Sequence, residues 1–169
     1  MRILGAIIKF ITFPGAFLHM FWEQLVCVMY CANVEEAKAI QLNEMCGHVE
    51  HDVMKTKGEQ FLLCFFPFLF NLILGLLLSG VAVAKVFVLG EANVIFYIML
   101  WVGGSLLTNL FPLIEDAMDM WNRIYSDGTN LFVKIIAAPI CAVLYAGAYL
   151  NTYGVTLLTT IGLFSLCLI

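Results

Sequence analysis

The sequence predicts an all-α, polytopic integral membrane protein with four to five membrane-embedded helices. Its 169 residues are 63% apolar and 12% charged, whereas a soluble domain is typically about 45–50% apolar and about 25% charged. Residues 61–84 and 92–114 contain no charge. At about 1.5 Å per residue, each run can cross about 30 Å of hydrocarbon as a helix. Residues 135–169 form a third uncharged run.

Residues 14–31 are predicted to form the first full helix, with Pro14 in its first turn, where the missing N–H has no helical partner. His19 and Glu23 lie inside this apolar segment. A glutamate within a spanning helix is expensive and normally faces protein rather than lipid. We therefore expect this helix to pack at the centre of the bundle.

The C-terminal run 135–169 is too long for one ordinary span. The residues NTYG at 151–154 are typical of a turn, so the run predicts two short helices at about 135–150 and 153–169. With four or five alternating spans, the polar stretches 32–60 and 115–134 fall on the same side. Together they carry five basic residues, whereas the other side carries three. Because basic residues are enriched in cytoplasmic loops, this difference favours a cytoplasmic location for both stretches. The five are Lys38, Lys55, Lys57, Arg123 and Lys134.

The spacing of His19 and Glu23 is the sharpest functional signal. Positions four apart share one helix face, and the HExxH motif of zinc peptidases presents two ligands in this way. Here the sequence reads His-Met-Phe-Trp-Glu, so Met20 stands where the general base belongs and Glu23 replaces the second histidine. A third ligand could be Asp116. The alternative is a buried polar pair that satisfies its own hydrogen bonds.

The remaining groups that could bind metals carry weaker signals. Five of the six cysteines lie in or beside apolar stretches, which favours small buried hydrophobes over a disulfide framework. The segment CGHVEHD at 46–52 matches no standard zinc spacing. We predict a solvated polar loop there.

Four motifs together resemble small membrane zinc peptidases related to the site-2 protease group. In order, they are FPGAFLHMFWEQLVCVMYC at 13–31, GHVEHD at 47–52, FPFLFNLILGLLL at 66–78 and FPLIEDAMDMW at 111–121. The resemblance implies a peptidase-like core over 1–121, followed by a C-terminal helical hairpin over 122–169, in a single membrane domain of 1–169. It also implies His19, Glu23 and Asp116 as ligands of a single divalent metal such as zinc, if any cofactor is present.

Met20 argues against the activity that this resemblance implies. Loss of a general base typically costs about 10²–10⁴-fold in rate. We therefore expect a catalytically inactive metallopeptidase-like membrane protein, a pseudoenzyme with no catalytic residues, that acts by binding as a subunit of a larger membrane assembly. Its partners would be the lipid bilayer and other membrane subunits or hydrophobic segments. Scattered basic residues exclude nucleic acid.

Two other classes of function stay open. One is an active intramembrane zinc metallopeptidase with an atypical site. The other is a transporter or channel component, in which His19, Glu23 and Asn71 would line a polar path.

Overall fold

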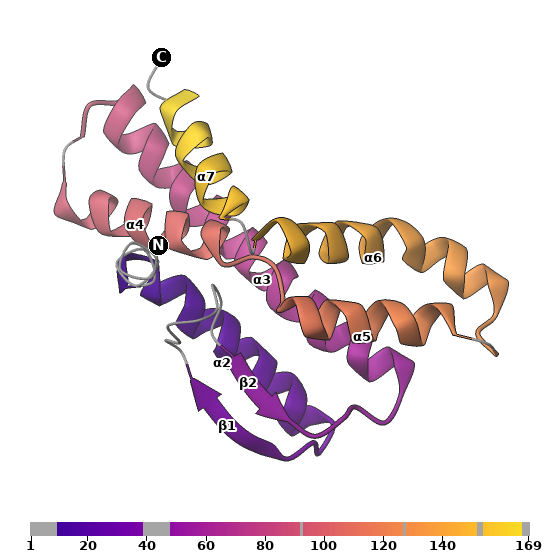
Figure 1. The fold of residues 1–169 in the computed structure, drawn as a ribbon. Helices are drawn as coiled ribbons and strands as arrows, with labels where there is room; N and C mark the ends of the chain where they lie inside the picture. The colour runs from indigo at the N-terminus through magenta and orange to yellow at the C-terminus, as the bar shows by residue number, and fades with distance from the viewer. Residues whose placement is uncertain (1–9, 39–47, 92, 127, 152–153, 167–169) are drawn as a thin grey trace.

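The computed structural model describes residues 10–38, 48–91, 93–126, 128–151 and 154–166. Over these residues the chain is mostly helical, as predicted, with one small antiparallel sheet (Figure 1). The elements in chain order are α2 (Phe13–Met29), β1 (Val34–Lys38), β2 (His48–His51), α3 (Lys57–Val83), the π-helical turn η1 (Ala84–Val88), α4 (Val94–Thr108), α5 (Ile114–Tyr125), α6 (Leu131–Asn151) and α7 (Val155–Leu166).

Helix α3 is the central element, because α2, α4 and α5 all pack against it (Figure 1). It starts at a capping box: the Thr56 hydroxyl accepts from the Glu59 N–H, and the Glu59 carboxylate accepts from the Thr56 N–H. This arrangement satisfies two amides that have no helical partner. The start of α2 is also as predicted, with Pro14 in its first turn.

Two helices are long and apolar enough to cross a membrane among the described residues. They are α3 continued by η1, Lys57–Val88, and α6, Leu131–Asn151. The four to five spanning helices that the sequence predicts are not confirmed by helix length. The predicted break at 151–154 is present, since α6 ends at Asn151 and α7 begins at Val155.

The uncharged run 92–114 does not form one continuous helix. Helix α4 has 15 residues, or about 22 Å at about 1.5 Å per residue, and it ends before Asn109. The Asn109 side chain donates to the carbonyls of Ser105 (2.9 Å) and Thr12 (3.2 Å), and Pro112 follows soon after. The Asn109 side chain and Pro112 together favour the end of α4 at this point. The span predicted over 92–114 is therefore interrupted.

Glycines allow α4 to approach both α2 and α3. A Cβ at Gly15 of α2 would collide with the backbone of Ser105, and a Cβ at Gly103 would lie 2.6 Å from the Ser79 amide nitrogen of α3. The Ser105 hydroxyl accepts from the Gly15 N–H (2.5 Å) and donates to the Thr12 carbonyl (2.8 Å). Small residues at such crossings bring helix backbones together.

We expect Gly103→Ala to destabilise the protein by about 1–3 kcal/mol, the range for overpacking a closely packed site. The matched control is Gly80→Ala, because a Cβ at Gly80 meets no heavy atom within 4 Å and alanine is the better helix former. Unfolding titrations in detergent micelles measure both variants. Equal stabilities would contradict the close approach of α3 and α4.

The polar segment after α2 contains a β-ribbon that the sequence analysis missed. Strand β1 pairs with β2 from Val34 opposite His51 to Lys38 opposite His48, so the loop predicted over 46–52 is wrong at 48–51. Alternate residues of a strand share a face. Val49 is buried with Met20, Val26, Cys27, Met54 and Leu63, whereas Glu50 is exposed. The ribbon therefore covers α2.

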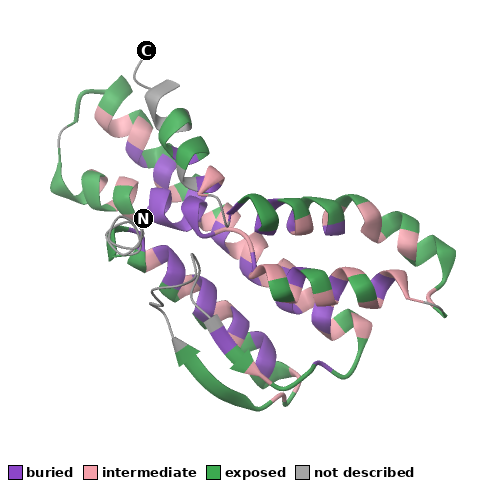
Figure 2. Ribbon diagram, in the orientation of Figure 1, coloured by how far each residue is buried: buried purple, intermediate pink, exposed green. Residues whose placement is uncertain are grey.

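Helix α5 is amphipathic, as its sequence pattern indicates. Ala117, Met120 and Ile124 are its buried residues, and the last two pack with Cys64, Cys141 and Leu144 of the neighbouring helices. Cys27, Cys64 and Cys141 are free and buried, as predicted, although Cys31 is exposed. Figure 2 shows the buried residues concentrated where α2, α3 and α4 meet and along the contact of α5 with α6.

The two polar stretches meet at one end of the molecule. Arg123 Nη1 donates to the Met54 carbonyl (2.7 Å), and Lys57 Nζ donates to the hydroxyls of Ser126 (2.9 Å) and Thr129 (2.6 Å). These contacts join Met54 and the first residue of α3 to α5 and the loop that follows α5.

Candidate functional site

His19 and Glu23 lie on the face of α2 that is turned into the protein. Their exposed fractions are 0% and 3%, and His19 Nε2 lies 3.2 Å from Glu23 Oε1. The two atoms are close, but their alignment does not make a hydrogen bond, since Nε2 has no hydrogen-bond partner. The i, i+4 spacing therefore produces the buried pair that the sequence suggested.

The other ring nitrogen of His19 determines how the imidazole is held. His19 Nδ1 lies 3.0 Å from the Asn109 carbonyl oxygen, which can only accept, so Nδ1 carries the proton. Asn71 Nδ2 of α3 donates to the same carbonyl (2.8 Å). The C-terminal end of α4 thus receives donors from both α2 and α3, and Nε2 is left facing Glu23.

Asp116 lies in the first turn of α5, beside a histidine of the β-ribbon. His51 Nε2 is 3.7 Å from Asp116 Oδ1. The contact with Asp116 is the largest cause that raises the pKa of His51 from its ordinary value of 6.5 to about 9, and the charge on Glu23 also raises it. The Asp116 carboxylate is therefore the main charged partner of His51.

His51 should remain protonated at pH 7 and lose its proton near pH 9. Because the pKa is raised on folding, the stabilisation is complete below about pH 6.5 and is lost as the pH rises through about 9. Asp116→Asn should move the pKa of His51 back toward 6.5. Histidine NMR titration in the presence of a chelator measures this change, and His51→Gln assigns the resonance. A pKa that stays near 9 in Asp116→Asn would contradict the pairing.

Met20 occupies the general-base position of the resembled motif. Its side chain is 8% exposed and packs in the apolar cluster with Val49, Met54 and Leu63. A thioether cannot take a proton from water at neutral pH. The face of α2 next to His19 is therefore a packing surface that receives the β-ribbon.

The predicted metal ligands take part in two contacts. His19 pairs with Glu23, and Asp116 pairs with His51. Within the described part of the chain, no group of three or more His, Cys, Asp or Glu side chains is placed to hold a metal ion. We therefore derive no chemical step through a metal, and ligation by His19, Glu23 and Asp116 stays a prediction.

Sequence reasoning missed two participants in this site. His51 falls in the segment for which the sequence predicts a solvated loop, and with one apolar residue in HVEH that segment carries no strand pattern. Asn109 was counted within an uncharged span, although an asparagine three residues before Pro112 is a helix-stop signal.

Comparisons with known proteins do not identify a relative. No family model matches the sequence, and neither a curated protein nor a solved structure matches it significantly.

Proposed function

We propose that the chain is a multi-pass integral membrane protein with the scaffold of a small zinc peptidase, which lacks peptidase activity and acts by binding within a larger membrane assembly. The observation that carries the proposal is Met20, buried in an apolar cluster where a peptidase of this kind needs its general base.

The membrane location is supported by the apolar surface as well as by the two long helices. Large apolar side chains are exposed on the outer faces of α2, α4 and α6; they include Phe17, Phe21, Ile95, Ile98, Ile135 and Ile136. Helices α2 and α4, with 17 and 15 residues, are shorter than a full span. Short helices can be accommodated by local thinning of the bilayer.

The contacts of His19 also support the proposed loss of activity. His19 Nδ1 faces the Asn109 carbonyl, and Nε2 faces Glu23. Hydrolysis by a zinc peptidase needs a metal-bound water and an acceptor for its proton. The proposal assigns no base role to Glu115, the exposed carboxylate next to Asp116 in sequence.

The test combines cleavage and assembly size. Purified chain with added zinc should leave a panel of membrane peptides uncut. The protein extracted gently from its native membrane should elute as a complex heavier than its 18.9 kDa chain. Cleavage that disappears in His19→Ala would contradict the loss of activity, and a monomer would contradict the role as a subunit.

The stretches 32–60 and 115–134 should both lie on the cytoplasmic side. Their contacts through Arg123 and Lys57 and their excess of basic residues support this placement. In a background with Cys31, Cys46 and Cys167 replaced by serine, cysteines at Glu35 and Asn122 should react with an impermeant reagent from the same side. A cysteine at Glu91, beyond α3, should react from the other side. Reaction of the first two from opposite sides would contradict the topology.

A further inference from the structure

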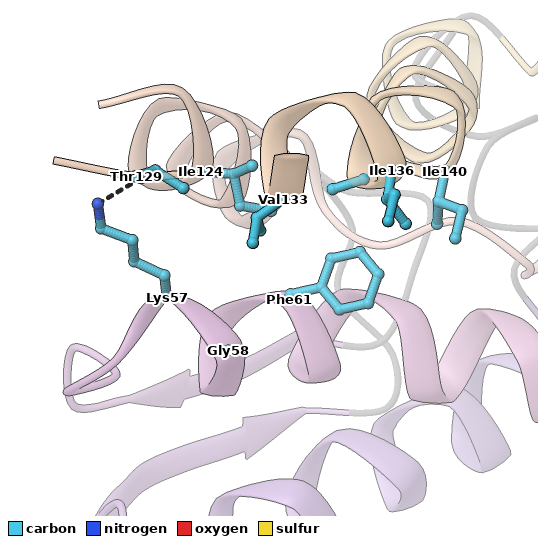
Figure 3. A pocket seen from close by; sticks show the side chains of 9 residues that line it. Lys57, Gly58, Phe61, Ile124, Thr129, Val133, Ile136 and Ile140 are labelled. Atoms are coloured by element: carbon cyan, nitrogen blue, oxygen red, sulfur yellow. Dashed lines mark hydrogen bonds between the residues drawn. The ribbon is translucent and has the colours of Figure 1, made fainter. Parts of the chain in front are cut away.

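An apolar groove runs between α3 and α6. Its wider part has a volume of about 440 Å³, with Lys57 and Thr129 as its polar lining residues. Figure 3 shows Lys57 at one end, Phe61 of α3 facing Val133 of α6, and Ile140 toward the other end. A second hollow of about 260 Å³ continues along the same two helices, from the shared Ile140 to Phe65 and Phe68.

Lys57 gives this groove a positive end. Its ammonium donates to the hydroxyls of Ser126 and Thr129, which orient it without neutralising it. None of the described carboxylates forms an ion pair with it. An ammonium has three donors, so one remains for an anion. Lys134, next to the lining residue Val133, directs its ammonium to the Tyr125 carbonyl at 3.2 Å and adds positive charge at this end.

The length of the groove fits one leaflet of a bilayer. From Lys57 to Phe68, α3 rises about 16 Å at about 1.5 Å per residue. Half of a hydrocarbon core of about 30 Å is about 15 Å. An acyl chain anchored at Lys57 would therefore lie along Phe61, Phe65 and Phe68 for the depth of its leaflet.

We propose that the groove between α3 and α6 binds an anionic glycerophospholipid, with its phosphate on Lys57 and one acyl chain against Phe61, Val133 and Ile140. The proposal rests on the membrane location proposed above. The cytoplasmic leaflet, where this end of the molecule is placed, is the one that is rich in anionic lipid.

Native mass spectrometry of the full chain tests the proposal, with phosphatidylglycerol and phosphatidylcholine of identical acyl chains in competition. The unmodified protein should retain phosphatidylglycerol in preference. Lys57→Gln should reduce that preference about fivefold, the change expected for one lysine near a charged surface. Lys55→Gln, which removes the same charge outside the groove lining, should leave the preference unchanged.

A second measurement concerns the acyl chain. A phosphatidylglycerol with a photoreactive group in its acyl chain should cross-link to α3 and α6, and Ala137→Phe, which places a ring in the groove, should abolish the cross-link. Any of three results would overturn the site. The unmodified protein could retain the two lipids equally, Lys57→Gln and Lys55→Gln could have equal effects, or the cross-links could be confined to other helices. If the protein fractionates with membranes but gives one of these results, the lipid site is refuted and the proposed membrane location stands. If the chain is soluble without detergent, the membrane location itself is refuted.

Discussion

The peptidase scaffold proposed above predicts that replacing Met20 with glutamate and Glu23 with histidine gives zinc-dependent cleavage of membrane peptides. The change restores HExxH at 19–23 and adds the base that Met20 cannot supply. We expect cleavage of membrane peptides to rise about 10²–10⁴-fold above background, the contribution of a positioned general base. Peptide cleavage and zinc stoichiometry, measured on the same purified sample, give the result.

The matched control is Met20→Gln with Glu23→His, which provides the same ligands and nearly the same side-chain shape without a base. It should bind zinc and remain inactive. If the glutamate variant folds and binds zinc but cleaves no faster than the glutamine variant, the peptidase scaffold is refuted. Retained activity after a further His19→Ala would show that the cleavage arises elsewhere.

Replacing His19 alone with leucine should destabilise the protein by about 1–3 kcal/mol, because it leaves the buried Glu23 carboxyl without its neighbour and removes the contact of Nδ1 with the Asn109 carbonyl. The double variant His19→Leu with Glu23→Leu should recover much of this loss, since apolar residues in place of a buried pair are often neutral or stabilising. Unfolding titrations in micelles, arranged as a double-mutant cycle, give the coupling energy.

Glu23→Leu completes the cycle and has a further use. It leaves the contact of His19 Nδ1 with the Asn109 carbonyl in place, so its effect isolates the contact of Nε2 with the carboxyl. Strictly additive effects would show that the two side chains do not stabilise each other. A large coupling with no bound metal would identify the pair as structural.

Much of the fold could be predicted because it depends on local chemistry. The uncharged run 61–84 gives a helix, Pro14 is favoured in a first helical turn, and α6 ends at Asn151, where the sequence 151–154 predicts a break. The inward orientation of His19 and Glu23 was also predictable, since ionisable groups in an apolar helix are expensive to expose to lipid.

Tertiary structure decided the features that depend on partners far apart in the chain. Residues 34–38 and 48–51 are too short and too polar to predict a ribbon, and it forms because Val49 finds an apolar surface on α2. Asn109 ends α4 where its amide reaches the Thr12 carbonyl, a contact that no local pattern contains. His51 joins Asp116 only because the ribbon and α5 converge. The sequence by itself determined that His19 and Glu23 are buried, because they lie in an apolar helix, and only packing determined which groups they contact.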